Sequence, residues 1–183
     1  MTAPRSPHRV AGGITLGLGP RDDPTDRDGD IFQDWLTGLP NRAAFRRRLR
    51  RVLDEAARGG PSVSVVVLGI DRFVALRREL GARVGARVLV HVAEHLLDRV
   101  PPPHEAASLG DGEFAVLVTG DVGDVVSTSI AVDVLRALQA PMVVSGQPVR
   151  IRARAGITST RPGQGVDEVL RNAYTALALT RRD

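Results

Sequence analysis

Between residues 34 and 181, apolar positions follow two different periods, which predicts a chain of helices and strands. Residues 62–70 (SVSVVVLGI) form a nearly continuous β-branched apolar run, which is typical of a strand buried on both faces. Apolar runs on both sides of residues 110–112 predict a hairpin. Residues 142–146 and 149–160 predict a second hairpin, whose alternating apolar positions leave arginines on a solvent-exposed face.

The remaining segments have the apolar spacing of amphipathic helices, at residues 41–57, 72–79, 84–99, 123–139 and 166–181. Asn41 is a suitable N-cap for the first helix. Prolines at 101–103 end the third helix, because proline cannot continue a helix. The element order, α β α α β β α β β α, predicts an α/β sandwich with a central, mostly antiparallel sheet flanked by helices.

Residues 1–30 show no sustained period and are rich in Pro, Gly, Arg and Asp. We therefore expect a disordered N-terminal tail before a single domain at residues 31–183. Asp26, Asp28 and Asp30 imitate the start of a calcium-binding loop, but Thr37 stands in the place of the closing glutamate. A threonine cannot supply a bidentate carboxylate, so the sequence does not predict a calcium site.

The composition narrows the classes of partner. Aromatic residues make up only 3% of the chain, and every basic residue is an arginine, which explains a pI near 11.0 at a net charge of +4. The densest arginine cluster, RAAFRRRLRR at residues 42–51, carries a single phenylalanine. A single-strand nucleic-acid binder would interleave such a cluster with aromatic side chains that stack on bases. We expect no nucleic-acid partner.

The compartment is predicted from what the sequence lacks. No apolar run reaches the roughly 18 residues of a membrane span, and the N-terminus carries no apolar signal segment. The chain also has no cysteine, which excludes disulfides and thiolate metal sites. We expect a cytoplasmic protein without a membrane segment.

The predicted helix at 84–99 contains a pattern that is typical of some zinc enzymes. His91, Glu94 and His95 match H-x-x-E-H. Zinc catalysis needs a third protein ligand, and the sequence offers no evident one. We expect these residues to form a solvated polar face of the helix.

Six segments, taken in order, resemble one family. DWLTGLPNRAAFRRRL (34–49) is similar to the D-x-L-T-G-L-P-N-R-x-x-F opening of GGDEF domains, and VVVLGIDRFVAL resembles the D-I-D-x-F-K turn. LGARVGARVL resembles G-H-x-x-G-D-x-x-L, and SLGDGEFAVL stands where R-x-G-G-D-E-F belongs. AGITST and NAYTALAL resemble S-I-G-I-S and A-D-x-A-L-Y. The chain is thus identified as a member of the GGDEF family of diguanylate cyclases.

The resemblance implies a fold related to nucleotidyl cyclases and polymerase palms. In such cyclases two domains meet, each with one GTP and divalent metal, and join the nucleotides into cyclic di-GMP. Two carboxylates on adjacent strands hold the metal ions, which prefer such hard oxygen ligands. By position these carboxylates fall on Gly69 and Gly112. The resemblance therefore implies a degenerate domain without a metal site, and we expect no cofactor.

Further positions of the family pattern are also replaced. The guanine-reading residues fall on Arg77 and Ala86, and the phosphate-contacting lysine of the F-K turn falls on Val74. Ser108 replaces the arginine before the signature, and no R-x-x-D inhibitory motif precedes it. What remains is a vestigial nucleotide site formed by Gly69, Ile70, Arg72, Phe73, Gly110, Gly112 and Arg181. The candidate catalytic carboxylates are Asp111, Glu113 and Asp71.

Three functions stay open at this stage. The expected one is a catalytically inactive signalling or protein-interaction module in cyclic di-GMP pathways, acting as a homodimer or with another signalling protein. The second is a sensor that binds a guanine nucleotide without turnover, through the 70–74 turn and Arg181. The third is an active cyclase in which Asp111 supplies the lost carboxylate and Mg²⁺ is the cofactor. A one-residue slip in a strand normally turns a side chain to the other face, although flanking glycines relax that rule.

Overall fold

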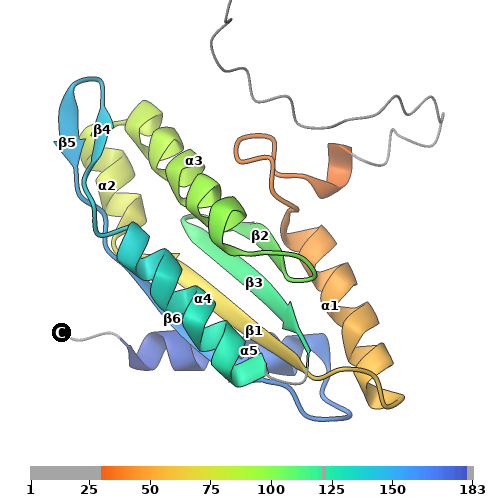
Figure 1. Cartoon of the computed structure of the whole chain (residues 1–183). Helices are drawn as coiled ribbons and strands as arrows, with labels where there is room; N and C mark the ends of the chain where they lie inside the picture. The colour runs from red at the N-terminus through yellow and green to blue at the C-terminus, as the bar shows by residue number, and fades with distance from the viewer. Residues whose placement is uncertain (1–29, 121–122, 181–183) are drawn as a thin grey trace, which may run out of the picture.

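The computed structural model describes residues 30–120 and 123–180. The predicted tail, apart from residue 30, and Arg181 therefore lie outside the described residues. Figure 1 shows the elements in chain order: η2 (Asp30–Phe32), α1 (Arg42–Ala57), β1 (Val63–Ile70), α2 (Phe73–Leu80), α3 (Ala82–Arg99), β2 (Glu105–Gly110), β3 (Glu113–Thr119), α4 (Gly123–Ala137), β4 (Met142–Val144), β5 (Gln147–Val149), β6 (Ala153–Ser159) and α5 (Val166–Leu179).

The centre of the fold is an antiparallel sheet with the strand order β2-β3-β1-β6. All eight residues of β1 are buried, as the continuous apolar run predicts. The hairpin predicted around residues 110–112 is the β2–β3 pair. The predicted α/β sandwich with a mostly antiparallel central sheet is confirmed.

Helices cover both faces of the sheet (Figure 1). Val65 and Val67 of β1 point to one face, where they pack with residues of α1 and α5. Val66 and Leu68 point to the other face, toward α3 and α4. This alternation follows from the two-residue period of a strand. In the described part of the chain, no helix is both long and apolar enough to cross a bilayer.

The second predicted hairpin is wrong in its second strand. Residues 142–144 pair with 147–149 as β4 and β5, so Val149 is the one residue of the predicted strand 149–160 that pairs with β4. Ser145 and Gly146 have φ of +52° and +80°, the positive values that a tight two-residue hairpin turn requires. β6 leaves this hairpin and pairs with β1 in the central sheet, where Ala155 and Ile157 pack against the core.

Helix α5 lies directly on β6 because Gly156 has no side chain. A Cβ at this position would lie 2.2 Å from the backbone nitrogen of Leu177 and 2.3 Å from the carbonyl oxygen of Ala173. No L side chain fits in that space. The close packing sets the height of α5 over the sheet, and it brings Tyr174 and Leu177 over the end of β1.

The two histidines of α3 do not form the solvated face that the sequence predicts. Both are half-buried, and their rings meet edge to face with centroids 4.5 Å apart. His91 Nε2 is buried and has no hydrogen-bond partner among the described residues. The pKa of His95 is lowered by its burial and, to a smaller extent, by the nearby His91 and Arg99. Within the described ranges, no group of three or more metal-ligating side chains is found.

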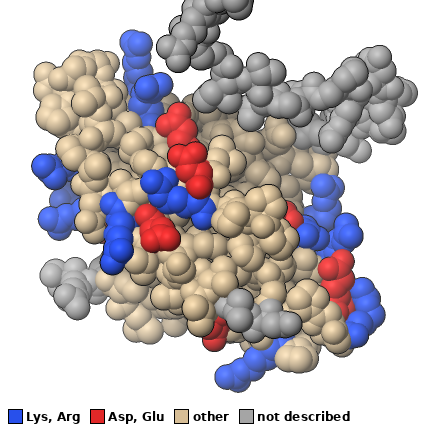
Figure 2. Space-filling view, in the orientation of Figure 1, with Lys and Arg blue, Asp and Glu red and all other residues tan. Residues whose placement is uncertain are grey.

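Four arginines of α1, Arg42, Arg46, Arg48 and Arg51, have acidic partners. Arg46 pairs with Asp167 at 2.6 Å and Arg48 pairs with Glu105 at 2.6 Å. On the face shown in Figure 2, described arginines and acidic residues are interspersed rather than gathered in one basic stripe. This face therefore does not present a continuous basic stripe.

Candidate functional site

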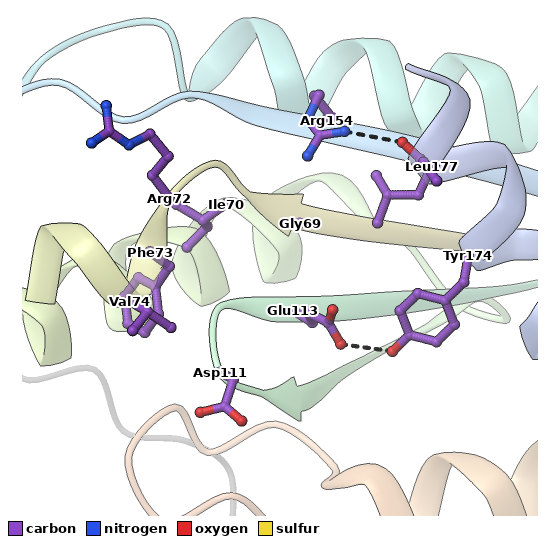
Figure 3. Close-up of a pocket in the computed structure, with 11 residues that line it drawn as sticks. Gly69, Ile70, Arg72, Phe73, Val74, Asp111, Glu113, Arg154, Tyr174 and Leu177 are labelled. Carbon is purple, nitrogen blue, oxygen red and sulfur yellow. Dashed lines mark hydrogen bonds between the residues drawn. The ribbon is translucent and has the colours of Figure 1, made fainter. Parts of the chain in front are cut away.

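A cavity of about 400 Å³ lies where β1 ends, between α5, the start of α2 and the β2–β3 turn (Figure 3). It is lined by Gly69, Ile70, Arg72, Phe73, Val74, Asp111, Glu113, Arg154, Tyr174, Leu177 and Ala178. Six residues of the predicted site are in this lining. Gly110 is the last residue of β2, Gly112 lies in the adjoining turn, and Asp71 directly follows β1. The structure thus brings the predicted residues together, with Arg181 outside the described range.

Three residues form a row across the sheet beneath this cavity. Gly69 of β1 is paired with Glu113 of β3 on one side and with Arg154 of β6 on the other. Directly opposed residues of antiparallel strands share one face, with Cβ atoms roughly 5 Å apart. The position of the first missing carboxylate is therefore flanked by an acid and by a base.

Arg154, the basic residue of this row, is held in place by two interactions. Arg154 Nε donates to the Asp71 carboxylate, and Arg154 Nη1 donates to the Leu177 carbonyl oxygen at 3.1 Å. The two side chains of the ion pair are 22% and 29% exposed, so the pair is largely shielded from water. Arg154 therefore links the end of β1 to the last turn of α5.

Glu113, the acidic residue of this row, also has partners within the protein. Glu113 Oε2 accepts a hydrogen bond from the Tyr174 hydroxyl at 2.7 Å, and Arg42 Nη2 lies 3.5 Å from the same oxygen. Arg42 is itself held by the Leu109 carbonyl oxygen, at 2.9 Å from Nε and 2.6 Å from Nη2. Burial, together with the hydrogen bond to Glu113, raises the pKa of Tyr174 to about 12.

The two positions where the family pattern has metal carboxylates differ in the space around them. A Cβ at Gly69 would meet only Leu177 Cδ2, at 3.4 Å, which is ordinary van der Waals contact. Gly112 has φ of +83°, and a Cβ there would lie 2.6 Å from Phe73 Cγ. The first position can accept a side chain, and the second is closed by the backbone and by Phe73.

Asp111 does not take the place of the missing carboxylates. Its φ is +53°, and it lies exposed at the tip of the β2–β3 turn. In Figure 3 its carboxylate points away from Gly69 and does not meet Glu113. It makes no hydrogen bond or ion pair with any other described residue. The geometry does not support a carboxylate shifted by one position.

The α2 end of the cavity has unpaired backbone donors. Arg72 is the N-cap residue of α2 with φ of +53°, and its side chain does not cap the helix. The first N–H groups of a helix have no intrahelical partner, so Phe73 and Val74 present amides here. The lining holds two arginines, Arg72 and Arg154, and two acids, Asp111 and Glu113, so its formal charges balance.

The side chains present do not fit a divalent metal. Mg²⁺ requires several oxygen ligands in near-octahedral geometry. Of the three candidate carboxylates, Asp71 is bonded to Arg154, Glu113 is bonded to Tyr174, and Asp111 points elsewhere. Sequence reasoning missed Arg42, Arg154 and Tyr174 as site residues, although all three lie inside the motifs or next to them.

Comparisons with known proteins agree on one family. The family model described as "Diguanylate cyclase, GGDEF domain" matches residues 31–183. Diguanylate cyclase TpbB of Pseudomonas aeruginosa strain UCBPP-PA14 is 34% identical over 125 residues, which is 68% of this chain and 29% of TpbB. Diguanylate cyclase DgcP of P. aeruginosa strain PAO1 is 32% identical over 162 residues, 86% of this chain and 23% of DgcP. The chain spans less than a third of the length of either relative.

Solved structures show the same fold. The coiled coil and GGDEF domain of DgcB from Caulobacter crescentus, in complex with cyclic di-GMP, matches with a TM-score of 0.78 at 27% identity, over 85% of this chain and 83% of that one. The GGDEF domain of P. aeruginosa TpbB matches with a TM-score of 0.75 at 31% identity, over 80% and 87%. P. aeruginosa SiaD, solved with its activator SiaC, matches with a TM-score of 0.75 at 25% identity, over 84% and 62%.

Proposed function

The chain belongs to the GGDEF domain family, which is linked to cyclic di-GMP signalling, and we propose that it is a catalytically inactive member that acts through protein contacts. The observation that carries this proposal is the row Glu113–Gly69–Arg154. Gly69 occupies the first metal position, between a glutamate that is hydrogen-bonded to Tyr174 and an arginine that is paired with Asp71. Both candidate metal positions are glycines.

The chemistry of the family explains why these replacements matter. Joining two GTP molecules requires each 3′-hydroxyl to attack an α-phosphate, and phosphoryl transfer depends on metal ions that orient and neutralise the phosphates. Gly69 and Gly112 supply no ligand, and Asp71 and Glu113 are bonded within the protein. This arrangement supports a pocket that does not turn over GTP.

An exposed apolar site supports the interaction role. Trp35 is 91% exposed and Ile31 is 60% exposed, both just before α1. Exposed large apolar side chains of this kind are common at protein–protein interfaces. SiaD, which was solved with its activator SiaC, shows that a GGDEF protein can associate with a protein partner. The partner of this chain is a second copy or another signalling protein, and we place both in the cytoplasm.

The second candidate function is a guanine-nucleotide sensor without turnover. The observation that favours it is the open cavity of about 400 Å³, with the α2 amides of Phe73 and Val74 at one end. Such a sensor would bind the phosphates through backbone donors, so its binding would be saturable without magnesium.

Titration calorimetry of the purified protein separates these functions. GTP is titrated with and without Mg²⁺, and cyclic di-GMP is titrated in a separate run. The inactive module predicts no saturable heat with GTP at sub-millimolar concentration. Saturable binding without Mg²⁺ would favour the sensor, and binding that Mg²⁺ tightens would overturn the inactive assignment. Sedimentation across a concentration series then tests for a homodimer.

A further inference from the structure

Arg154 lies beside the position where the family pattern has its first metal carboxylate, which is Gly69 in this chain. The two residues are directly opposite each other on the same face of the sheet, so the Arg154 side chain starts about one strand spacing from Gly69. Its guanidinium then bonds Asp71 and the Leu177 carbonyl oxygen, two oxygens at the edge of the cavity. A positive charge is thus held next to the place where carboxylates would hold a metal ion.

A guanidinium and a divalent cation compete for the same oxygens. Arginine stays charged at every relevant pH and donates through a rigid planar fork, which matches a carboxylate well. A metal ion on Asp71 would have to displace this partner and then sit next to the displaced positive charge. With Arg154 in place, Asp71 is withheld from metal.

We propose that Arg154 is the resident cation of this pocket, standing in place of the divalent metal. Its guanidinium neutralises Asp71, ties α5 to the end of β1 and keeps the pocket free of metal. This inference rests on the proposed loss of the metal site and adds the residue that occupies it. Aligned on Gly156, the S-I-G-I-S pattern has a serine at the position of Arg154, so the arginine is a departure of this chain.

The inference predicts that restoring a carboxylate alone does not restore metal binding. Gly69→Asp is sterically acceptable, because the nearest atom to the new Cβ is Leu177 Cδ2 at 3.4 Å. The new carboxylate, however, is directly opposite Arg154 and pairs with it. In Gly69→Asp/Arg154→Ser the guanidinium is gone, so the new carboxylate and Asp71 can share a cation, while Glu113 keeps its hydrogen bond to Tyr174.

The experiment measures Mn²⁺ binding by the electron paramagnetic resonance signal of free Mn²⁺. Four proteins are compared: wild type, Gly69→Asp, Arg154→Ser and Gly69→Asp/Arg154→Ser. We expect no saturable binding to wild type or Gly69→Asp. The double variant is expected to bind Mn²⁺ saturably, with a dissociation constant at least about tenfold below the highest Mn²⁺ concentration at which Gly69→Asp shows no saturation, which is the scale of effect that residues around a metal site have on affinity.

A matched control separates Arg154 from general charge removal. Arg72 also lines the cavity, and Asn tolerates its left-handed φ of +53°. Gly69→Asp/Arg72→Asn removes the same charge, and we expect it to bind no better than Gly69→Asp. Circular dichroism melting checks that each variant is folded. For a variant that fails to fold, Arg154→Gln, which keeps most of the side chain's packing, takes the place of Arg154→Ser.

Two results would overturn the inference. One is saturable Mn²⁺ binding by the wild-type protein that Asp71→Asn abolishes. The other is equal affinity of Gly69→Asp and its Arg154→Ser double variant. Neither result depends on catalysis, because the readout is metal binding. Synthesis of cyclic di-GMP by the wild-type protein would instead contradict the proposed function, so the two failures are distinguishable.

Discussion

The ring of Phe73 lies against Gly112 so closely that a Cβ added to the glycine would be 2.6 Å from Phe73 Cγ and 2.7 Å from Phe73 Cβ. Gly112 also has φ of +83°. The two residues together make the start of β3 a place where only glycine fits. The second metal position of the family pattern is thus closed by packing, while the first, at Gly69, stays open.

Gly112→Ala is expected to destabilise the fold by about 2–4 kcal/mol, because the left-handed φ and the overlap with Phe73 both oppose a side chain. Gly110→Ala is the matched control. Gly110 has φ of +87° but no atom within 4 Å of an added Cβ, so only the backbone cost of about 1–2 kcal/mol applies. Urea unfolding measures both, and equal costs would contradict the close contact.

The packing of α5 on β6 makes a second prediction. Gly156→Ala places a methyl group 2.2 Å from the Leu177 nitrogen, and backbone cannot rotate away as a side chain can. We expect a loss of roughly 3 kcal/mol or more in unfolding free energy. Gly165→Ala, with no atom within 4 Å of the added Cβ and no positive φ, should change it by only about 0.5 kcal/mol. Similar effects in the two variants would argue against the direct α5–β6 contact.

Tyr174 is the only tyrosine in the chain, so an ultraviolet titration of phenol ionisation reports this residue alone. Its pKa should be about 12, against 10.0 for an ordinary tyrosine, because burial and the hydrogen bond to Glu113 favour the protonated form. Glu113→Gln should lower it toward the ordinary value, leaving the part due to burial. A wild-type pKa of the ordinary value would contradict both the burial of Tyr174 and its hydrogen bond to Glu113.

The raised pKa of Tyr174 also predicts how the free energy of unfolding changes at alkaline pH. The folded state holds the proton of Tyr174 more tightly than the unfolded state. This contribution to the unfolding free energy is therefore fully present below pH 10.0 and is lost as the pH rises through about 12. Denaturant unfolding at a series of alkaline pH values should show a smaller loss across this window in Tyr174→Phe than in the wild type.

The ion pair between Asp71 and Arg154 should be energetically coupled. Both side chains are less than a third exposed, so removal of one leaves the other poorly hydrated. Asp71→Asn and Arg154→Ser are each expected to cost about 1–3 kcal/mol, and the double variant less than the sum. Additive costs in this double-mutant cycle would show that the pair contributes nothing.

Sequence reasoning succeeds where the determining interactions are local. The continuous apolar run of β1 and the helical periods give these elements to within a few residues, and the motif segments identify the family. Ser145 and Gly146 form the two-residue turn that joins β4 to β5, and the apolar pattern does not reveal their positive φ values. The second strand of this hairpin was therefore predicted wrongly, because β6 pairs with β1, which is far away in the chain.

For the candidate site, the sequence predicts which residues reach the pocket but not which contacts they make there. The resemblance brings Gly69, Arg72 and Glu113 to one pocket, and the structure places them there. The bonds that occupy the carboxylates join residues 83 apart for Arg154 and Asp71 and 61 apart for Tyr174 and Glu113. No local pattern encodes such pairings, since they depend on strand register and on the height of α5 over the sheet.

Incubation of the purified protein with GTP and Mg²⁺, followed by chromatography for cyclic di-GMP, tests the central claim most directly. The GGDEF domain of P. aeruginosa TpbB, a relative named as a diguanylate cyclase, serves as the comparison under the same conditions. We predict no cyclic di-GMP from this chain, whether Mg²⁺ is present or absent. Magnesium-dependent formation of cyclic di-GMP by the wild-type chain would contradict the account.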